Sequence, residues 1–222
     1  TEATNQTLAA VDGGAPALGA WEGRWQTGYR THGDVFLYNP RLSGIPNEHR
    51  SHTVDATGRL QRPFGGATRI TVGSEIGGDW IRSNNLGDHH IARGSAFAEA
   101  QRRIGARAFV YPGLRLDAYS TFGRAWSPSI AAAAWLGEGV KLRASVGRAF
   151  RVPTFTERFY VDPNNLGTPT LAPEHAWSSE AGLDWLPSPG WAAGFAVFDR
   201  HERDTIDFVR PSPLVRWQAA NI

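Results

Sequence analysis

The chain has 222 residues, and its 23 basic and 21 acidic side chains nearly balance, which argues against a nucleic-acid-binding protein. Cysteine is absent, so neither a disulfide framework nor thiol chemistry is available. No apolar run approaches the about 20 residues that a spanning helix needs, which excludes a helical membrane protein but not a membrane barrel, whose strands give a weak signal.

Apolar and polar residues alternate along most of the chain, and this period of two predicts β-strands. Residues 1–11 alternate poorly, and the segment 13–19 (GGAPALG) is predicted to be a turn. Clearer strands follow at 21–31, 53–60, 69–80, 89–103, 108–119, 126–136, 140–151, 171–185 and 191–209. Residues 217–222 have the pattern of a strand that is cut short. We therefore expect an all-β protein of about ten or eleven antiparallel strands.

The connections between these strands alternate in length. Segments 63–66, 105, 137–139 and 187–190 are short, whereas 33–50 and 153–170 are long. Outer-membrane barrels have short periplasmic turns and longer extracellular loops. We therefore expect a transmembrane β-barrel whose extracellular segments are 33–50, 84–88, 121–124, 153–170 and 210–213.

The predicted strands have one charged face and one apolar face. Charges buried in a soluble core cost several kcal/mol each, whereas charges that line a wet lumen cost little. The opposite face carries Trp177 and Trp185, whose spacing suits the aromatic girdles of a membrane barrel. The predicted charged face carries Arg69, Glu75, Asp79, Arg93, Glu99, Arg115, Asp117, Arg143 and Glu180.

Residues 140–183 carry a recognisable set of motifs. The first strand ends in Phe150-Arg151-Val152-Pro153-Thr154, where Pro153 has no N–H to donate to a neighbouring strand, and the chain then reaches Glu157. The next strand follows Gly167-Thr168-Pro169-Thr170-Leu171-Ala172-Pro173-Glu174 and contains Glu180 and Gly182. These motifs resemble those of the TonB-dependent outer-membrane receptors, although Thr168 stands where that family usually has Asn.

The resemblance implies a partial barrel domain over residues 1–222, taken from a larger barrel of the roughly 22-stranded type. The plug domain, the segment that engages the TonB complex and the final strands would then lie outside this sequence. The chain ends on Ile222, whereas complete barrels of this kind end on an aromatic residue, which agrees with that expectation.

The resemblance further implies that the protein lies in the outer-membrane lipid and takes up a metal chelate such as a ferric siderophore or cobalamin. Segments 31–37, 81–89 and 217–222 resemble the vitamin B12-receptor branch more loosely. Haem receptors of the family carry a His between the two motifs, and the interval 153–171 has none, which argues against haem.

Neither a catalytic constellation nor a metal-ligand motif stands out, so we expect no enzyme activity, no cofactor and no bound metal. Tyr160, Asn164 and Asn165, near the tip of the long loop, are candidate ligand contacts, because aromatic rings and amides suit a large chelate. His32, His49 and His52 flank the 33–50 loop, and three imidazoles brought together there would suit a metal-centred ligand.

Two other readings of the sequence remain open at this point. One is a complete small outer-membrane barrel that acts as a porin, an adhesin or an enzyme. The other is a secreted carbohydrate-binding β-sandwich.

Overall fold

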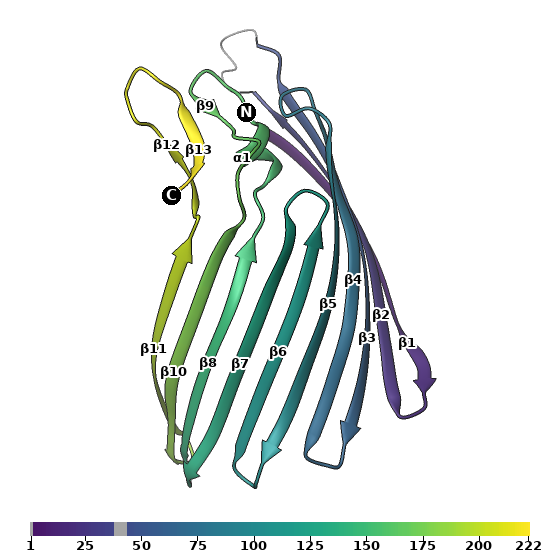
Figure 1. The fold of residues 1–222 in the computed structure, drawn as a ribbon, viewed down its shortest axis with the longest axis vertical. Helices are drawn as coiled ribbons and strands as arrows, with labels where there is room; N and C mark the ends of the chain where they lie inside the picture. Colours follow the sequence, from purple (N-terminus) through teal and green to yellow (C-terminus); the bar gives the residue numbers. More distant parts are fainter. Residues whose placement is uncertain (1, 38–43) are drawn as a thin grey trace.

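The computed structural model describes residues 2–37 and 44–222, with residues 15–18 described by their backbone alone. Ten long strands form one antiparallel sheet in the order β1-β2-β3-β4-β5-β6-β7-β8-β10-β11 (Figure 1). These strands are β1 (Glu2–Leu18), β2 (Trp21–Phe36), β3 (Asn47–Phe64), β4 (Thr68–Ser83), β5 (His89–Ile104), β6 (Ala108–Tyr119), β7 (Gly123–Gly137), β8 (Val140–Arg151), β10 (Glu174–Ser188) and β11 (Trp191–Arg203). The predicted all-β class and strand number are confirmed.

The two ends of the sheet differ, as the connection lengths predict. At the turn end the strands are joined by residues 19–20, 65–67, 105–107, 138–139 and 189–190. At the loop end the connections are 37–46, 84–88, 120–122 and 152–173. The loop end also holds the helix α1 (Phe155–Phe159) and a small sheet of β9 (Asn165–Leu166), β12 (Ile206–Val209) and β13 (Trp217–Asn221). None of the helical segments in the described residues has the length and hydropathy needed to cross a membrane.

Two sequence predictions are wrong near the ends of the chain. The segment 13–18 belongs to β1, so the predicted turn shrinks to residues 19–20. Gly13 fits the strand because the Trp25 ring covers it, and a Cβ there would lie 2.9 Å from that ring. The strand predicted to reach 209 ends at Arg203, because Asp204 adopts a φ of 56° that breaks the extended backbone. The strand expected at the end of the chain is present as β13, residues 217–221, and it belongs to the small sheet.

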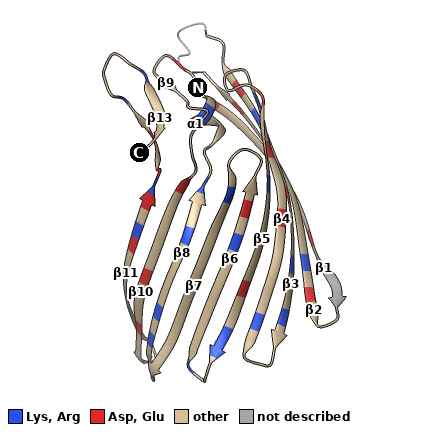
Figure 2. Cartoon of the chain, in the orientation of Figure 1, with Lys and Arg blue, Asp and Glu red and all other residues tan. Residues whose placement is uncertain are grey.

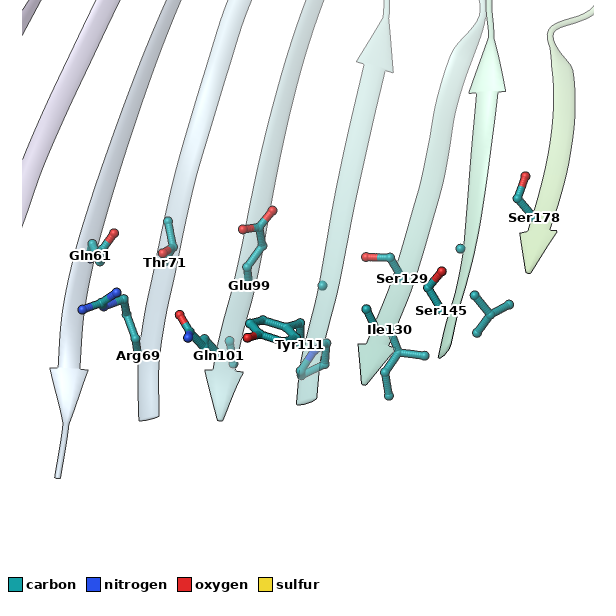
Figure 3. A pocket seen from close by; sticks show the side chains of 16 residues that line it. Gln61, Arg69, Thr71, Glu99, Gln101, Tyr111, Ser129, Ile130, Ser145 and Ser178 are labelled. Atoms are coloured by element: carbon teal, nitrogen blue, oxygen red, sulfur yellow. The ribbon is translucent and has the colours of Figure 1, made fainter. Parts of the chain in front are cut away.

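Strand pairing confirms the predicted faces. Residues that are partners on neighbouring strands share a face of the sheet, and one such row runs through Glu22, Gln61, Thr71, Glu99, Gly113, Ser129, Gly147 and Ser178. Several of these side chains surround a hollow of about 590 Å³ (Figure 3). We call this side the polar face, and alternation places all the predicted lumen charges on it.

The other side of the sheet is the apolar face. Its rows include Ile104, Ala108, Ala134, Leu142, Leu183 and Phe195. Trp177 and Trp185 share this face and are 47% and 50% exposed. Among the described residues no second layer covers this side, and many of its large apolar side chains are exposed.

The same arrangement of one arginine, one glycine and two acidic residues occurs twice on the polar face. Arg93 lies opposite Gly77 and pairs with Glu75 at 3.8 Å and with Asp79. Arg143 lies opposite Gly182 and pairs with Glu180 and, at 3.6 Å, with Asp184. Both follow the pattern Glu-x-Gly-x-Asp on one strand with Arg on its neighbour, and we call each an arginine clamp.

The glycine of each clamp makes room for the guanidinium. A Cβ on Gly77 would lie 3.0 Å from Arg93 Cζ, and one on Gly182 would lie 2.8 Å from Arg143 Cζ. The first clamp is extended by Arg115, which reaches Glu75 at 3.3 Å and the buried Asp117 at 2.9 Å. The charged residues of these two groups lie on β4, β5 and β6 and on β8 and β10, whereas β7 between them carries no charged residue except Arg124 (Figure 2).

Candidate functional site

Most of the buried residues of the molecule lie at the loop end. Leu171, Ile206 and Ala219 form a small apolar core, against which Phe208 packs. Pro153 is fully buried nearby, and Ile81 and Leu86 are buried around the 84–88 connection. The loops at this end therefore form a packed structure in their own right.

The long connection 152–173 begins with a capped helix. Thr154 caps α1, since its hydroxyl accepts from the Glu157 backbone N–H at 3.2 Å and Glu157 Oε2 accepts from the Thr154 N–H at 2.7 Å. This reciprocal capping box satisfies two backbone donors that the helix start would otherwise leave open. The sequence analysis did not predict this helix, although the Thr-x-x-Glu spacing that indicates a helix start is visible in the sequence.

Arg151 joins the capped helix to the next long strand. Its guanidinium donates to Glu174 at 2.6 and 2.7 Å and to Glu157 at 2.9 and 3.0 Å. Glu174 in turn accepts from the Ile206 N–H at 2.5 Å. These residues, which we call the arginine knot, connect β8, α1, β10 and β12, and they give the Phe-Arg-x-Pro-Thr and Pro-Glu motifs a structural role.

Hydrogen bonds and burial shift the pKa values of Glu157 in the knot and of its neighbour Arg158. Burial raises the pKa of Glu157, but hydrogen bonds from Arg151 and Thr154 outweigh burial and hold that pKa below its ordinary value. Burial lowers the pKa of Arg158, whose guanidinium lies over the Phe122 ring at 5.0 Å and donates to Pro169 O at 3.1 Å.

A second set of contacts fastens the long loop to the 84–88 connection. The His89 ring stacks on Phe159 with centroids 3.6 Å apart and lies 6.3 Å from Phe155. Asn85 donates to Val161 O at 2.6 Å and accepts from Val161 N at 3.3 Å. We call these five residues the loop clasp, because they join segments that are 76 residues apart in the chain.

The C-terminal strand completes the packed end. β13 pairs in parallel with β9, and Trp217 N–H donates to Asn164 O at 2.7 Å. The Asn221 amide bonds both ways to the backbone of Ala172, at 2.9 and 3.0 Å. Sequence reasoning missed Asn85 and Asn221, because nothing in the local pattern indicates a partner so distant in the chain.

The predicted contact residues of the long loop lie together, and all three are bonded to Asp162. Asp162 accepts from the Asn164 and Asn165 backbone N–H groups at 2.6 and 2.5 Å, and from the Asn165 side chain at 2.9 Å. Tyr160 also bonds to Asp162, and these donors outweigh the effect of burial, so that the Asp162 pKa lies below its ordinary value. A role for Tyr160, Asn164 and Asn165 in ligand contact stays a prediction.

The three candidate histidines do not gather at one point. His32 lies opposite Ser51, and His49 lies opposite Asp34 and bonds to Ser83 Oγ at 2.7 Å, so both share the polar face. His52 is on the apolar face, where its ring accepts or donates a 2.8 Å bond with Tyr29. The predicted grouping of three imidazoles is therefore wrong, because a strand sends His49 and His52 to opposite sides. Part of the 33–50 loop lies outside the described residues, and within the described ones no group of three metal-ligating side chains occurs.

Comparison with known proteins defines the class of this fold. A family model described as "TonB dependent receptor-like, beta-barrel" matches residues 4–222. The chain belongs to this family, whose members are transport receptors rather than enzymes. The resemblance carried by the motifs around Arg151 is thereby confirmed.

Two curated relatives share the sequence in part. The chain is 31% identical over 115 residues to the ferric enterobactin receptor PirA of Pseudomonas aeruginosa, a match that covers 43% of this chain and 15% of the relative. It is 26% identical over 161 residues to the ferrienterobactin receptor of Escherichia coli K12, covering 63% of this chain and 21% of the relative. The matched part is thus a minor share of each relative.

Solved structures share the fold at lower identity. The siderophore receptor PirA of Pseudomonas aeruginosa superposes with a TM-score of 0.84 at 22% identity, covering 99% of this chain and 42% of that one. A haemophore receptor of Serratia marcescens, HasR, gives a TM-score of 0.83 at 17% identity, covering 99% of this chain and 44% of that one.

Proposed function

We propose that this chain forms part of the wall of an outer-membrane receptor that takes up a ferric siderophore with energy supplied through the TonB complex. The family membership carries the proposal, and both curated relatives are named as receptors for ferric enterobactin. The two faces of the sheet agree with it, because an apolar face suits outer-membrane lipid and a charged face suits a wet lumen.

The sheet itself supports a larger barrel. β1 and β11 are the two edges of the ten-stranded sheet and are not partners of each other. In a complete small barrel, the first alternative above, these edges would have to pair. A carbohydrate-binding sandwich, the second, would need another sheet packed face to face on the long one. We therefore take residues 1–222 as a partial barrel domain, with the plug and the remaining strands supplied by further chain.

The ligand class rests on the relatives rather than on a bound molecule. The names of the curated relatives favour a ferric siderophore over cobalamin, although looser sequence likenesses pointed to the cobalamin branch. The packed loop end, with the loop clasp and the arginine knot, offers aromatic and amide groups around the extracellular mouth.

Transport by the intact receptor tests the function. The full-length protein is expressed in a Gram-negative strain that lacks its own siderophore and cobalamin receptors, with and without a functional TonB complex. We expect TonB-dependent accumulation of iron supplied as ferric enterobactin and none of labelled cyanocobalamin. Accumulation of cobalamin alone would replace the ligand, and accumulation that ignores TonB would contradict the proposal.

A further inference from the structure

Two arginines interrupt the apolar face near the turn end. Arg62 in β3 lies opposite Ile70, and Arg102 in β5 lies opposite Thr68 and Val110. Both therefore share the face of Leu183 and Phe195, not that of the arginine clamps. Figure 2 shows Lys and Arg in blue close to the turn ends of these strands.

Neither arginine has an acidic partner. Within residues 2–37 and 44–222, the ion pairs closer than 4.0 Å include neither side chain. Arg102 donates to Thr68 Oγ1 at 3.2 Å. The Arg62 guanidinium lies 4.7 Å over the Phe64 ring, and its buried Nε finds no hydrogen-bond partner among the described groups. Trp21 packs edge-on against the same Phe64 at 6.1 Å.

An apolar hollow of about 600 Å³ is lined by Val110, the partner of Arg102 on β6, and by Ile104, two residues beyond Arg102 on β5. Its floor is built from small residues such as Ala108, Ala132 and Ala134, and its lining also includes Ile104, Phe195 and Val197. Ile104 is the last residue of β5, whereas Phe195 and Val197 lie well inside β11. The hollow therefore extends from the turn end of β5 to the inner part of β11.

We propose that Arg62 and Arg102 hold the phosphate of an anionic glycerophospholipid in the periplasmic leaflet, with one acyl chain in the alanine-floored hollow. The arginines are two strand spacings apart across the sheet and two residues apart along it, about 12 Å in all, and two long side chains can span this distance to converge on one headgroup. Guanidinium groups bind phosphate through paired hydrogen bonds, and long basic side chains reach from apolar surface to the headgroup level. The inference rests on the proposed function for the membrane and its orientation, but not on the identity of the transported chelate.

The test compares two pairs of substitutions with the same change of charge. R62Q/R102Q removes the arginines on the apolar face, and R69Q/R103Q removes their neighbours, which alternation places on the polar face. Each full-length receptor is purified in detergent, checked for heat-modifiable mobility, and titrated with phosphatidylglycerol, with phosphatidylcholine of the same acyl chains, or with inorganic phosphate. Native mass spectrometry counts the bound molecules. TonB-dependent iron uptake is measured on the same variants.

We expect the wild type and R69Q/R103Q to retain phosphatidylglycerol in preference to phosphatidylcholine, and R62Q/R102Q to bind it at least about tenfold more weakly, since each basic residue adds to the attraction of an anionic headgroup. Should R62Q/R102Q fail to fold, the single variant R102Q, whose side chain is exposed, is used in its place. Equal loss in both double variants, no loss in either, or inorganic phosphate bound as tightly as the lipid would overturn the proposal. If R62Q/R102Q loses lipid binding but keeps iron uptake, the lipid site is separate from transport. If the wild type itself shows no TonB-dependent uptake, the proposed function is contradicted and the lipid site is not.

Discussion

At the scale of single residues, Arg151 holds more of the loop end together than any other side chain described above. Its guanidinium bonds to two carboxylates that come from the loop helix and from the start of β10. Arg151→Gln would leave Glu157 and Glu174 without that shared cation. Hydrogen bonds to charged groups contribute about 1.5–3 kcal/mol each, less when the pair is partly exposed as here.

We therefore expect Arg151→Gln to raise hydrogen exchange of backbone amides in residues 152–173 of the full-length receptor, with strands β2 to β7 unchanged. Lys141→Gln is the matched control, because Lys141 pairs with Asp184 at 3.7 Å near the turn end of the sheet, away from the knot. Equal exchange in both variants would show that the knot is no stronger than an ordinary surface ion pair.

The lowered pKa values of Glu157 and Asp162 give the loop a pH dependence. A carboxyl group whose pKa is lower in the folded state stabilises that state above its ordinary pKa and loses this contribution as the pH falls through the folded value. The loop should therefore hold at neutral pH and loosen below about pH 4.

A spin label measures this loosening. The chain lacks cysteine, so Ala172→Cys in a full-length receptor that is otherwise free of cysteine takes a single label, and its mobility should increase as the pH drops below that range. In the Glu157→Gln background the label should be more mobile at neutral pH and respond less to acid. An unchanged acid transition in that background would assign the effect to other carboxylates.

The triple substitution of Tyr160, Asn164 and Asn165 by Ala separates two roles for the loop tip. If these residues contact the chelate, binding by the intact receptor should weaken by about 1–3 kcal/mol, the cost of leaving polar partners unpaired. The bonds of Asp162 to this segment instead favour a loss of loop protection with binding retained. Isothermal titration and hydrogen exchange on the same variant decide between these outcomes.

At the scale of the strands, facing is the property that can be tested most directly. Single cysteines at Val72, Ile76, Leu116 or Leu183 should react with lipid-soluble thiol reagents and resist water-soluble ones in the membrane-embedded receptor. Cysteines at Glu75, Arg115 and Glu180 should do the reverse, because these positions share the polar face. Equal labelling of both sets by the aqueous reagent would rule out the membrane-facing assignment.

The sequence predicts these faces well because alternation is a local signal. The long strands from β2 to β10 and the short turns follow from residues that are neighbours in the chain. The phase of β7, hidden by Ala131 to Ala134, becomes clear only through its pairing, which sets Ser129 beside Gly113 and Gly147.

What could not be predicted depends on contacts between distant segments. The course of the chain after Arg203 is set by the core around Leu171 and Ile206, not by the apolar pattern of residues 206–209. The loop clasp depends in the same way on Asn85 meeting Val161. The histidine prediction failed for a different reason. His49 and His52 lie near the same loop, but strand alternation sends their side chains to opposite faces of the sheet.

At the scale of the whole molecule, the open edges of the long sheet determine how residues 1–222 behave alone. Every residue of β11 is exposed, and in lipid each unpaired backbone group costs several kcal/mol. We expect the isolated chain not to refold into detergent as a heat-resistant monomer, whereas the full-length receptor should. A single heat-modifiable band from residues 1–222 in gel electrophoresis would show that the sheet closes on itself.

The two arginine clamps have a consequence for how the strands find their alignment. A slip of one residue would turn the apolar residues of a strand to the wet side, so the alternating pattern already rejects it. A slip of two residues keeps every face correct and escapes that penalty. Such a slip would, however, place Arg93 opposite an acidic residue instead of Gly77, and Arg143 opposite an acidic residue instead of Gly182. The new partner has a side chain where the glycine leaves room for the guanidinium, and only one acid remains within reach. The alternating pattern therefore disfavours a register shift of one residue, and the arginine clamps disfavour a shift of two. Each clamped pair of strands is thus left with one favoured register.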